Sequence, residues 1–238
     1  NVCVETNIGH KRAKNEDAYQ LVYGGEAGYD LASFGMMFAV ADGMGGHPGG
    51  EVASRVAREG LLDYYAGELE TGMDLNPREI RLRRLDKLIW GIDKKISRMG
   101  EEMPEYANMG TTLSVLVLFE RHALIAHVGD SRVYRLRNGV LEQLTLDDTM
   151  AQLSLEMGYL KPEEVPGHPQ GHILIQALGV GLDEVNTRVE KVAAGDTFLL
   201  CSDGLYDMVS DERIREILHR STATKGPCGE LVEAALRN

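Results

Sequence analysis

Short apolar segments separated by turn residues recur along this chain, and they predict β-strands. The expected strands are residues 2–6, 36–42, 111–119, 122–129, 132–137 and 197–203. Some alternate apolar and polar residues and others are apolar throughout, which are the patterns of half-buried and fully buried strands. Asn138-Gly139 lies between two alternating segments and is a strong signal for a type I′ hairpin turn. Neighbouring strands are therefore expected to run antiparallel.

Helical periodicity appears in other parts of the chain. The expected helices are residues 49–69, 76–99, 211–220 and 229–238. The second of these starts with Asn76 as a cap, Pro77 at the first helical position and Glu79 at the third. Residues 149–175 are mixed in character and interrupted by Pro and Gly, so we expect a mobile flap with a short helix there. The spacing of the histidines in this flap does not define a metal site.

Strands and helices come in blocks along the sequence and do not alternate strictly. This order favours antiparallel sheets covered by helices over a doubly wound parallel sheet. The chain has 238 residues, of which 43% are hydrophobic. That composition suits one domain over residues 1–238 with a sizeable core.

Charge and cysteine content narrow the classes of function. The formal net charge of −12 argues against a nucleic-acid-binding face. It fits a protein that gathers carboxylates for metal ions, and it fits ordinary solubility equally well. No apolar run approaches the roughly 20 residues of a membrane helix, and no signal peptide is visible. Cys3, Cys201 and Cys228 are far apart and suggest no disulfide framework, so a reducing cytoplasm is the expected location.

A glycine-rich corner follows one apolar segment, in the sequence VADGMGGHPGGEVAS at residues 39–53. Asp42 ends the apolar run, and the glycines after it allow close approach of the backbone. The segment has no P-loop lysine and lacks the dinucleotide-binding spacing. One interpretation is a carboxylate beside an exposed carbonyl, which hard divalent cations bind. The other is a tight strand–helix turn with an Asp cap, and this stretch alone favours neither.

Further acidic corners favour the metal interpretation. Asp203 follows an apolar strand, with Asp207 four residues later, and Asp130 follows another strand and a glycine. Glu16 and Asp17 form a fourth acidic cluster. Converging carboxylates repel one another unless cations neutralise them, and all-oxygen ligation favours Mg²⁺ or Mn²⁺. Two such ions about 3.5–4 Å apart can activate a water and hold a phosphate.

Taken in order, these segments resemble the metal-dependent type 2C Ser/Thr protein phosphatases, in their compact bacterial form. The matching pieces are RAKNEDA (12–18), VADGMGGHPGGE (40–51), MGTTL (109–113), VGDSRVYRLRNG (128–139), ALG (177–179) and GDTFLLCSDGLYD (195–207). The resemblance implies an α+β fold, a four-layer αββα sandwich of two stacked antiparallel sheets flanked by helix pairs. It also implies hydrolysis of phosphoserine and phosphothreonine in proteins by a metal-activated water, without a phosphoenzyme.

The resemblance assigns roles to individual residues of the metal site. It implies that Asp42 bridges two Mg²⁺ or Mn²⁺ ions, that Gly43 offers its carbonyl to one, and that Asp203 binds the other. It implies that Glu16 and Asp17 hold metal-bound waters.

Two further assignments concern phosphate and a third ion. Arg12, five residues before Asp17, matches the family's phosphate-binding arginine, and its planar group suits phosphate better than a lysine would. Asp130 and Asp207, with Asp203, match the weaker third-metal site of bacterial members.

The chain departs from the family pattern at two points. Many eukaryotic members have a histidine two residues after the bridging aspartate, where this chain has Met44. The general acid is then either a metal-bound water or the nearby His47, which is a candidate substrate contact. The family also ends in an Asp-Asn motif, while this sequence stops at LVEAALRN. We therefore expect the given sequence to lack the C-terminal strand and its metal ligand.

Three functions are weighed on this basis. The first is a cytoplasmic, monomeric phosphatase acting on phosphorylated proteins, the targets of Ser/Thr kinases. The second is a catalytically silent relative that binds phosphoproteins, supported by the missing C-terminal motif. The third is an Mg²⁺-dependent hydrolase of small phosphate esters or nucleotides, which the absence of a nucleotide-binding loop disfavours.

Overall fold

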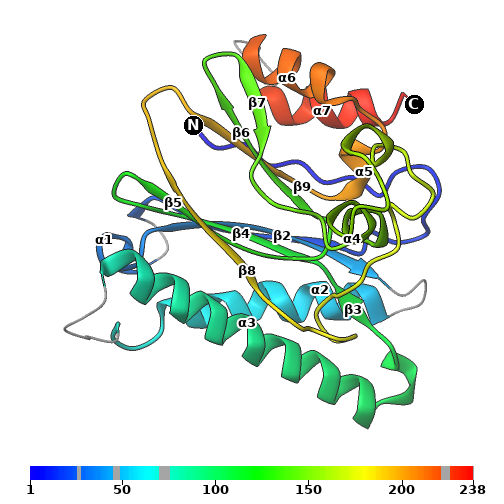
Figure 1. Ribbon diagram of the computed structural model, residues 1–238. Helices are drawn as coiled ribbons and strands as arrows, with labels where there is room; N and C mark the ends of the chain where they lie inside the picture. Colours follow the sequence, from blue (N-terminus) through cyan, green and yellow to red (C-terminus); the bar gives the residue numbers. More distant parts are fainter. Residues whose placement is uncertain (26–27, 45–48, 70–75, 221–225, 238) are drawn as a thin grey trace.

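The computed structural model arranges the chain as two stacked antiparallel β-sheets with helices on both outer faces (Figure 1). It describes residues 1–25, 28–44, 49–69, 76–220 and 226–237. The four layers run from one helix pair through the two sheets to a second helix pair. The α+β sandwich predicted from the sequence is therefore confirmed.

The larger sheet has the strand order β1-β2-β4-β5-β8, with β3 paired to β2. Its strands are β1 (Asp17–Val22), β2 (Met36–Met44), β3 (Gly110–Thr111), β4 (Leu113–Phe119), β5 (His122–Val128) and β8 (Asn186–Lys191). Each of these neighbouring pairs is antiparallel. The predicted strand at 111–119 is thus interrupted at Thr112, which belongs to neither β3 nor β4.

The smaller sheet has the order β7-β6-β9. Its strands are β6 (Arg132–Arg137), β7 (Val140–Gln143) and β9 (Thr197–Cys201). Asn138 and Gly139 connect β6 to β7 with φ angles of 52° and 77°. Positive φ at both central residues is the requirement of a type I′ turn, so the predicted hairpin is confirmed.

Helices α2 (Gly49–Gly60) and α3 (Pro77–Glu102) cover the outer face of the larger sheet (Figure 1). The Asn76 side chain accepts hydrogen bonds from the backbone of Arg78 and Glu79, and the Glu79 side chain accepts one from the Asn76 backbone. This capping box satisfies backbone donors that have no partner within the helix. The chain after α2 continues as a 3-10 helix, η2 (Leu61–Tyr65), so the helix predicted for 49–69 is shorter than expected.

Helices α6 (Asp211–Arg220) and α7 (Gly226–Ala235) lie on the smaller sheet (Figure 1). Acids in the first turn of α6 and bases in its last turn complement the helix dipole. The remaining short helices are α1 (Leu31–Phe34), η3 (Pro104–Tyr106), α4 (Met150–Glu156), η4 (Pro162–Glu164) and α5 (Asp203–Tyr206). The short helix α4 confirms the helical turn predicted within the flap.

Three apolar clusters hold the layers together. The largest lies between the larger sheet and helices α2 and α3. A second lies between the smaller sheet and helices α6 and α7. The third joins the two sheets and includes Leu116, Ile125 and Val133, with Phe38 and Leu200 packed against it. The inner faces of the sheets therefore pack directly on each other, as in other sandwiches.

Strand assignments at the two edges of the larger sheet differ from the predictions. Residues 2–6 form no strand, and both Val2 and Val4 are 40% exposed. In contrast, β1 and β8 were not predicted. Each of the two is an edge strand with a polar side chain at several positions, so its hydrophobic pattern is weak.

A disulfide joins Cys3 to Cys228, with the sulfur atoms 2.04 Å apart. The prediction that the cysteines form no disulfide was wrong, because 225 residues of sequence hide the proximity of these two in space. The cysteine argument for a reducing compartment no longer holds. Cys201 is a free thiol within the core, as expected. No helix in the described ranges is long and apolar enough to cross a membrane.

Candidate metal centre

Asp42 lies near the end of β2, and its side chain faces the gap between the two sheets. Alternate residues of β2 are buried, and Met37, Ala39 and Ala41 pack in the cluster beneath α2. Asp42 is an even number of residues from Phe38, which packs against the inter-sheet cluster. Because side chains alternate between the faces of a strand, Asp42 shares the inner face with Phe38.

Asp17 is the direct cross-strand partner of Asp42 in the β1–β2 ladder. Asp17 also accepts a hydrogen bond from the Ser202 hydroxyl, with an oxygen–oxygen distance of 2.9 Å. Ser202 lies between α5 and β9, a strand of the smaller sheet, directly before Asp203. This contact brings the end of the smaller sheet to the end of the larger one.

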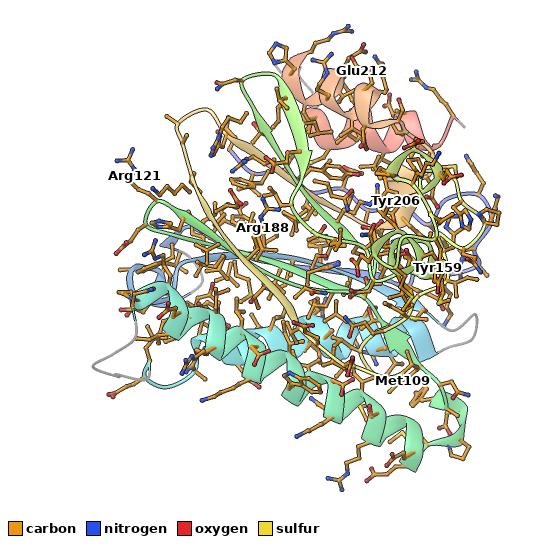
Figure 2. The ribbon with its side chains drawn as sticks, viewed as in Figure 1. Met109, Arg121, Tyr159, Arg188, Tyr206 and Glu212 are labelled. Carbon is orange, nitrogen blue, oxygen red and sulfur yellow. A yellow bond between two sulfur atoms is a disulfide. The ribbon has the colours of Figure 1, made fainter. Side chains whose placement is uncertain are left out.

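Asp130 and Asp207 extend the acidic site along the same edge. Asp130 follows β5 and is 5% exposed, and its carbonyl accepts a hydrogen bond of 3.1 Å from the Tyr206 hydroxyl. Figure 2 shows the position of Tyr206 in the molecule. Tyr206 belongs to α5, which begins at Asp203, and Asp207 follows it. The short helix thus delivers Asp203 and Asp207 to the region where Asp130 leaves β5.

Burial and neighbouring acidic charges raise the pKa values of four of these acids. Burial, followed by the charges of Asp17, Asp203 and Asp130, raises the pKa of Asp42 to about 9. Burial and then Asp203 raise the pKa of Asp130 to about 7. The pKa of Asp17 is raised mainly by burial, with Asp203 adding to it. Burial and Asp203 also raise the pKa of Asp207.

The charge of Asp203 is among the causes that raise the pKa of Asp42, so the two acids lie close enough to interact electrostatically. Among the described residues, no three His, Cys, Asp or Glu side chains already form a group that could hold an ion. The donor set nevertheless fits hard divalent cations, since it consists of carboxylate oxygens with a backbone carbonyl beside them. The acids would need to draw together around the cations.

Gly43 lies where three backbone segments meet. A Cβ atom at this position would lie 2.3 Å from the Gly50 carbonyl oxygen and 2.6 Å from that of Glu16. The Gly43 N–H donates to the Glu16 carbonyl over 3.2 Å, and the Ser54 hydroxyl donates to the same oxygen over 2.6 Å. Only glycine fits here, so the backbone beside Asp42 is fixed by close packing.

Arg12 and Glu16 form an ion pair at the edge of the site, with a nitrogen–oxygen distance of 3.1 Å. The Arg12 side chain is 64% exposed, whereas that of Glu16 is 14% exposed. The Arg12 guanidinium is therefore largely open to solvent while it pairs with Glu16. His47, the candidate substrate contact, lies outside the described residues.

Several polar residues at the site were not predicted from the sequence. The Thr112 hydroxyl accepts the Asp42 N–H over 3.0 Å, and the Thr111 hydroxyl donates to the Asp42 carbonyl over 2.9 Å. The only signal for this pair was its place in the MGTTL motif. His172 of the flap lies 3.4 Å from the Asp207 carboxylate, a contact that its spacing in the sequence did not indicate.

The two stacked antiparallel sheets, the flanking helix pairs and the acidic edge agree with the fold that the sequence resemblance implies. The family model described as protein phosphatase 2C matches residues 9–238, and the chain belongs to this family.

Two relatives and one solved structure agree with this assignment. The chain is 38% identical over 229 residues to the serine/threonine protein phosphatase PstP of Mycobacterium tuberculosis, covering 96% of this chain and 40% of PstP. It is 43% identical over 180 residues to the serine/threonine phosphatase stp of Listeria monocytogenes, covering 75% and 70% respectively. A crystal structure of the PstP catalytic domain with two manganese ions matches with a TM-score of 0.76 and 36% identity, over 98% of this chain and 90% of that chain.

Proposed function

We propose that this chain is a divalent-metal-dependent Ser/Thr protein phosphatase that hydrolyses phosphoserine and phosphothreonine in proteins. The observation that carries the proposal is the crowding of Asp17, Asp203 and Asp130 around Asp42, which raises the Asp42 pKa to about 9. Such crowding is unfavourable unless cations neutralise it. The names of the relatives support the same activity, although the chain spans 40% of the length of PstP.

In this proposal the chain's own residues hold the ions and the substrate. Asp42, the Gly43 carbonyl and Asp203 would hold two divalent cations, with Asp42 shared between them. The Glu16 carbonyl accepts a hydrogen bond from the Gly43 N–H, and Asp17 lies opposite Asp42. From these positions the two acidic side chains would orient waters bound to the cations. Bound Mg²⁺ or Mn²⁺ would lower the pKa of a water and neutralise charge on the phosphate.

Arg12 contributes to the binding of the phosphate in the substrate. Its guanidinium is exposed and held by Glu16, so two of its nitrogen donors can turn towards a phosphate. Asp130 and Asp207, together with Asp203, provide a third and weaker cation site. The manganese ions in the PstP structure support the use of a divalent cation in the homologous centre. The physiological substrates are expected to be proteins phosphorylated by Ser/Thr kinases.

The test is hydrolysis of a phosphothreonine peptide and of p-nitrophenyl phosphate, with Mn²⁺, with Mg²⁺ and with excess chelator. The proposal expects activity with either cation and its loss in chelator. Asp203→Asn should lower kcat by at least about a hundredfold, because it removes charge that stabilises the transition state. Glu101→Gln, an exposed change at the end of α3, serves as the control. Equal rates with and without chelator would reject the metal mechanism, and a comparison with nucleotides would show whether small esters are preferred.

A further inference from the structure

The buried carboxylate of Asp148 is not among the proposed metal ligands, but it is hydrogen-bonded to Gly129, the residue before Asp130. Asp148 is 9% exposed, and its Oδ2 atom accepts hydrogen bonds of 2.8 Å from both the Gly129 N–H and the Gln176 side-chain amide. Its Oδ1 atom accepts a third, of 3.0 Å, from the Asn186 side-chain amide. One side chain therefore receives donors from the end of β5, the segment after the flap and the start of β8.

The Asp148 backbone makes two further hydrogen bonds, one to Gly129 and one to the end of the flap. Its N–H donates to the Gly129 carbonyl over 2.7 Å, and its carbonyl accepts from the Ile175 N–H over 2.9 Å. The flap, residues 149–175, begins directly after Asp148 and ends at Ile175. Asp148 thus joins both ends of the flap to Gly129, the residue before Asp130.

Gly129 packs against Thr112, which contacts the backbone of Asp42. Its φ is +98°, and a Cβ atom here would lie 2.7 Å from the Thr112 side chain. Thr112 in turn accepts the Asp42 N–H. Since Gly129 packs tightly against Thr112, a displacement of Gly129 would disturb two of the proposed ligand positions, Asp130 and Asp42.

We propose that Asp148 is a positioning residue that holds the Gly129–Asp130 corner and both ends of the flap in one fixed arrangement. It touches no proposed ligand side chain, and it acts through the backbone of Gly129 and the amide of Gln176. This inference rests on the proposed function, because it assumes that Asp130 binds a cation. Removing a residue that orients a metal ligand through a hydrogen bond typically weakens metal affinity by about 10–100-fold.

The chain offers a matched control for Asp148. The Asp196 side chain is 1% exposed and lies in the connection between β8 and β9. It accepts the Ala193 N–H over 2.8 Å and binds Arg137 with nitrogen–oxygen distances of 2.6 and 2.7 Å. Asp196→Ala therefore removes a buried, hydrogen-bonded carboxylate that has no connection to the flap or to Asp130.

The experiment compares Asp148→Ala with Asp196→Ala in the full chain. Mn²⁺ binding is followed by electron paramagnetic resonance, and hydrogen exchange is followed in peptides spanning 126–131 and 170–178. We expect Asp148→Ala to raise the Kd of the weakest Mn²⁺ site about tenfold or more. Hydrogen exchange should become faster in both peptides. Asp196→Ala should change neither the Mn²⁺ affinity nor these exchange rates. A lowered Tm is expected for both variants and does not count as support.

Gln176→Glu provides a second variant should Asp148→Ala fail to fold. It preserves the shape of Gln176 and the acceptor for the Asp183 and Glu184 N–H groups, which lie 3.0 and 3.1 Å from the Gln176 Oε1 atom. It places a second carboxylate where an amide now donates to Asp148. The expected result is weaker Mn²⁺ binding and faster exchange at 170–178. Asp148→Asn, in the otherwise unchanged chain, keeps one acceptor oxygen and should behave more like the wild type than Asp148→Ala does.

Two results separate this inference from the proposed function. If Asp130→Asn abolishes the weakest Mn²⁺ site but Asp148→Ala and Gln176→Glu behave like Asp196→Ala, the positioning role is wrong and the metal site stands. If Asp130→Asn leaves all Mn²⁺ binding unchanged, the ligand assignment itself is wrong, and the inference falls with it.

Discussion

Asp17 and Asp42 are directly opposed at the end of the β1–β2 ladder. Like charges at opposed positions of a sheet destabilise it, and these two are also largely removed from water. Asp203 adds a third acid from the other sheet, next to the Ser202 hydroxyl that binds Asp17. These three acids therefore lie close together at the edge where strand ends of the two sheets meet, and their charges repel one another when ionised.

Substituting Asp42 should separate activity from stability. Burial and the neighbouring acids make ionisation of Asp42 unfavourable in the folded state. Asp42→Asn removes this cost, so the Tm of the chelator-treated protein should rise. The same change should lower kcat by at least about a hundredfold, because it removes the proposed bridging ligand. Thermal unfolding in chelator and phosphopeptide hydrolysis in Mn²⁺ measure the two effects. A variant with full activity would show that Asp42 is not a ligand.

Cation affinity should increase with pH. Burial and neighbouring acids raise the pKa of Asp42 to about 9 and that of Asp130 to about 7. Each protonated carboxyl must lose its proton to bind a cation, so the apparent Kd for Mg²⁺ should fall as the pH rises from about 6 to about 9. Calorimetric titration at constant ionic strength measures this change. A constant Kd over the range would contradict the proposed ligands.

The stability of the metal-free protein should show the opposite trend with pH. The ordinary pKa of an Asp is 3.8, and that of folded Asp42 is about 9. Between these values the unfolded chain gives up the proton more readily than the folded chain, so ionisation favours unfolding. The contribution of Asp42 to Tm in chelator should therefore fall as the pH rises from about 4 to about 9. Asp42→Asn is the control, since its Tm should depend less on pH in this interval.

A graded glycine series tests the packing beside the site. Gly43→Ala places a Cβ against two backbone carbonyls and should destabilise the protein by roughly 1–3 kcal/mol or more, with loss of Mn²⁺ binding. Gly50→Ala should have a smaller effect, because its nearest neighbours are 3.0 and 3.1 Å away and include the Glu16 side chain. Gly91→Ala in α3 meets nothing within 4 Å and should stabilise the helix by about 0.5–1 kcal/mol. Denaturant unfolding gives all three values, and a tolerated Gly43→Ala would be the contrary result.

Reduction of the Cys3–Cys228 bond should lower stability. Cross-links of native proteins typically contribute about 2–5 kcal/mol. The Tm of the wild type should drop on addition of a reductant, whereas the Cys3→Ser variant should be insensitive to it. Cys201→Ala is the control, because Cys201 is unpaired and the variant should keep the sensitivity. Equal Tm values for the wild type with and without reductant would argue against the cross-link.

Local sequence signals predicted the elements that local interactions determine. The Asn76 capping box and the α6 pattern each gave a helix close to its observed bounds, because the signals lie within the helix itself. Asn138-Gly139 gave the hairpin for the same reason. The acids at the ends of β2 and β9 could be recognised because each directly follows a strongly apolar strand.

Features that depend on distant pairing were not predictable. β1 begins with Asp17 and has a mixed pattern, so neither the strand nor its register opposite Asp42 was visible in the sequence. Residues 2–6 look like a strand, but their side chains remain exposed and no described strand pairs with them. Asp148 resembles a helix cap in sequence, yet Thr149 caps α4 and Asp148 binds three distant segments.

The Cys3–Cys228 bond makes the intervening polypeptide a covalent ring. A single proteolytic cut in the flap, for example beside the 78% exposed Tyr159, would leave both pieces linked through sulfur until a reductant is added. A mechanical pull applied at residues 1 and 237 would likewise pass along the first residues, through the sulfur bridge and into the end of α7. The sheets and the acidic edge would carry almost none of that load.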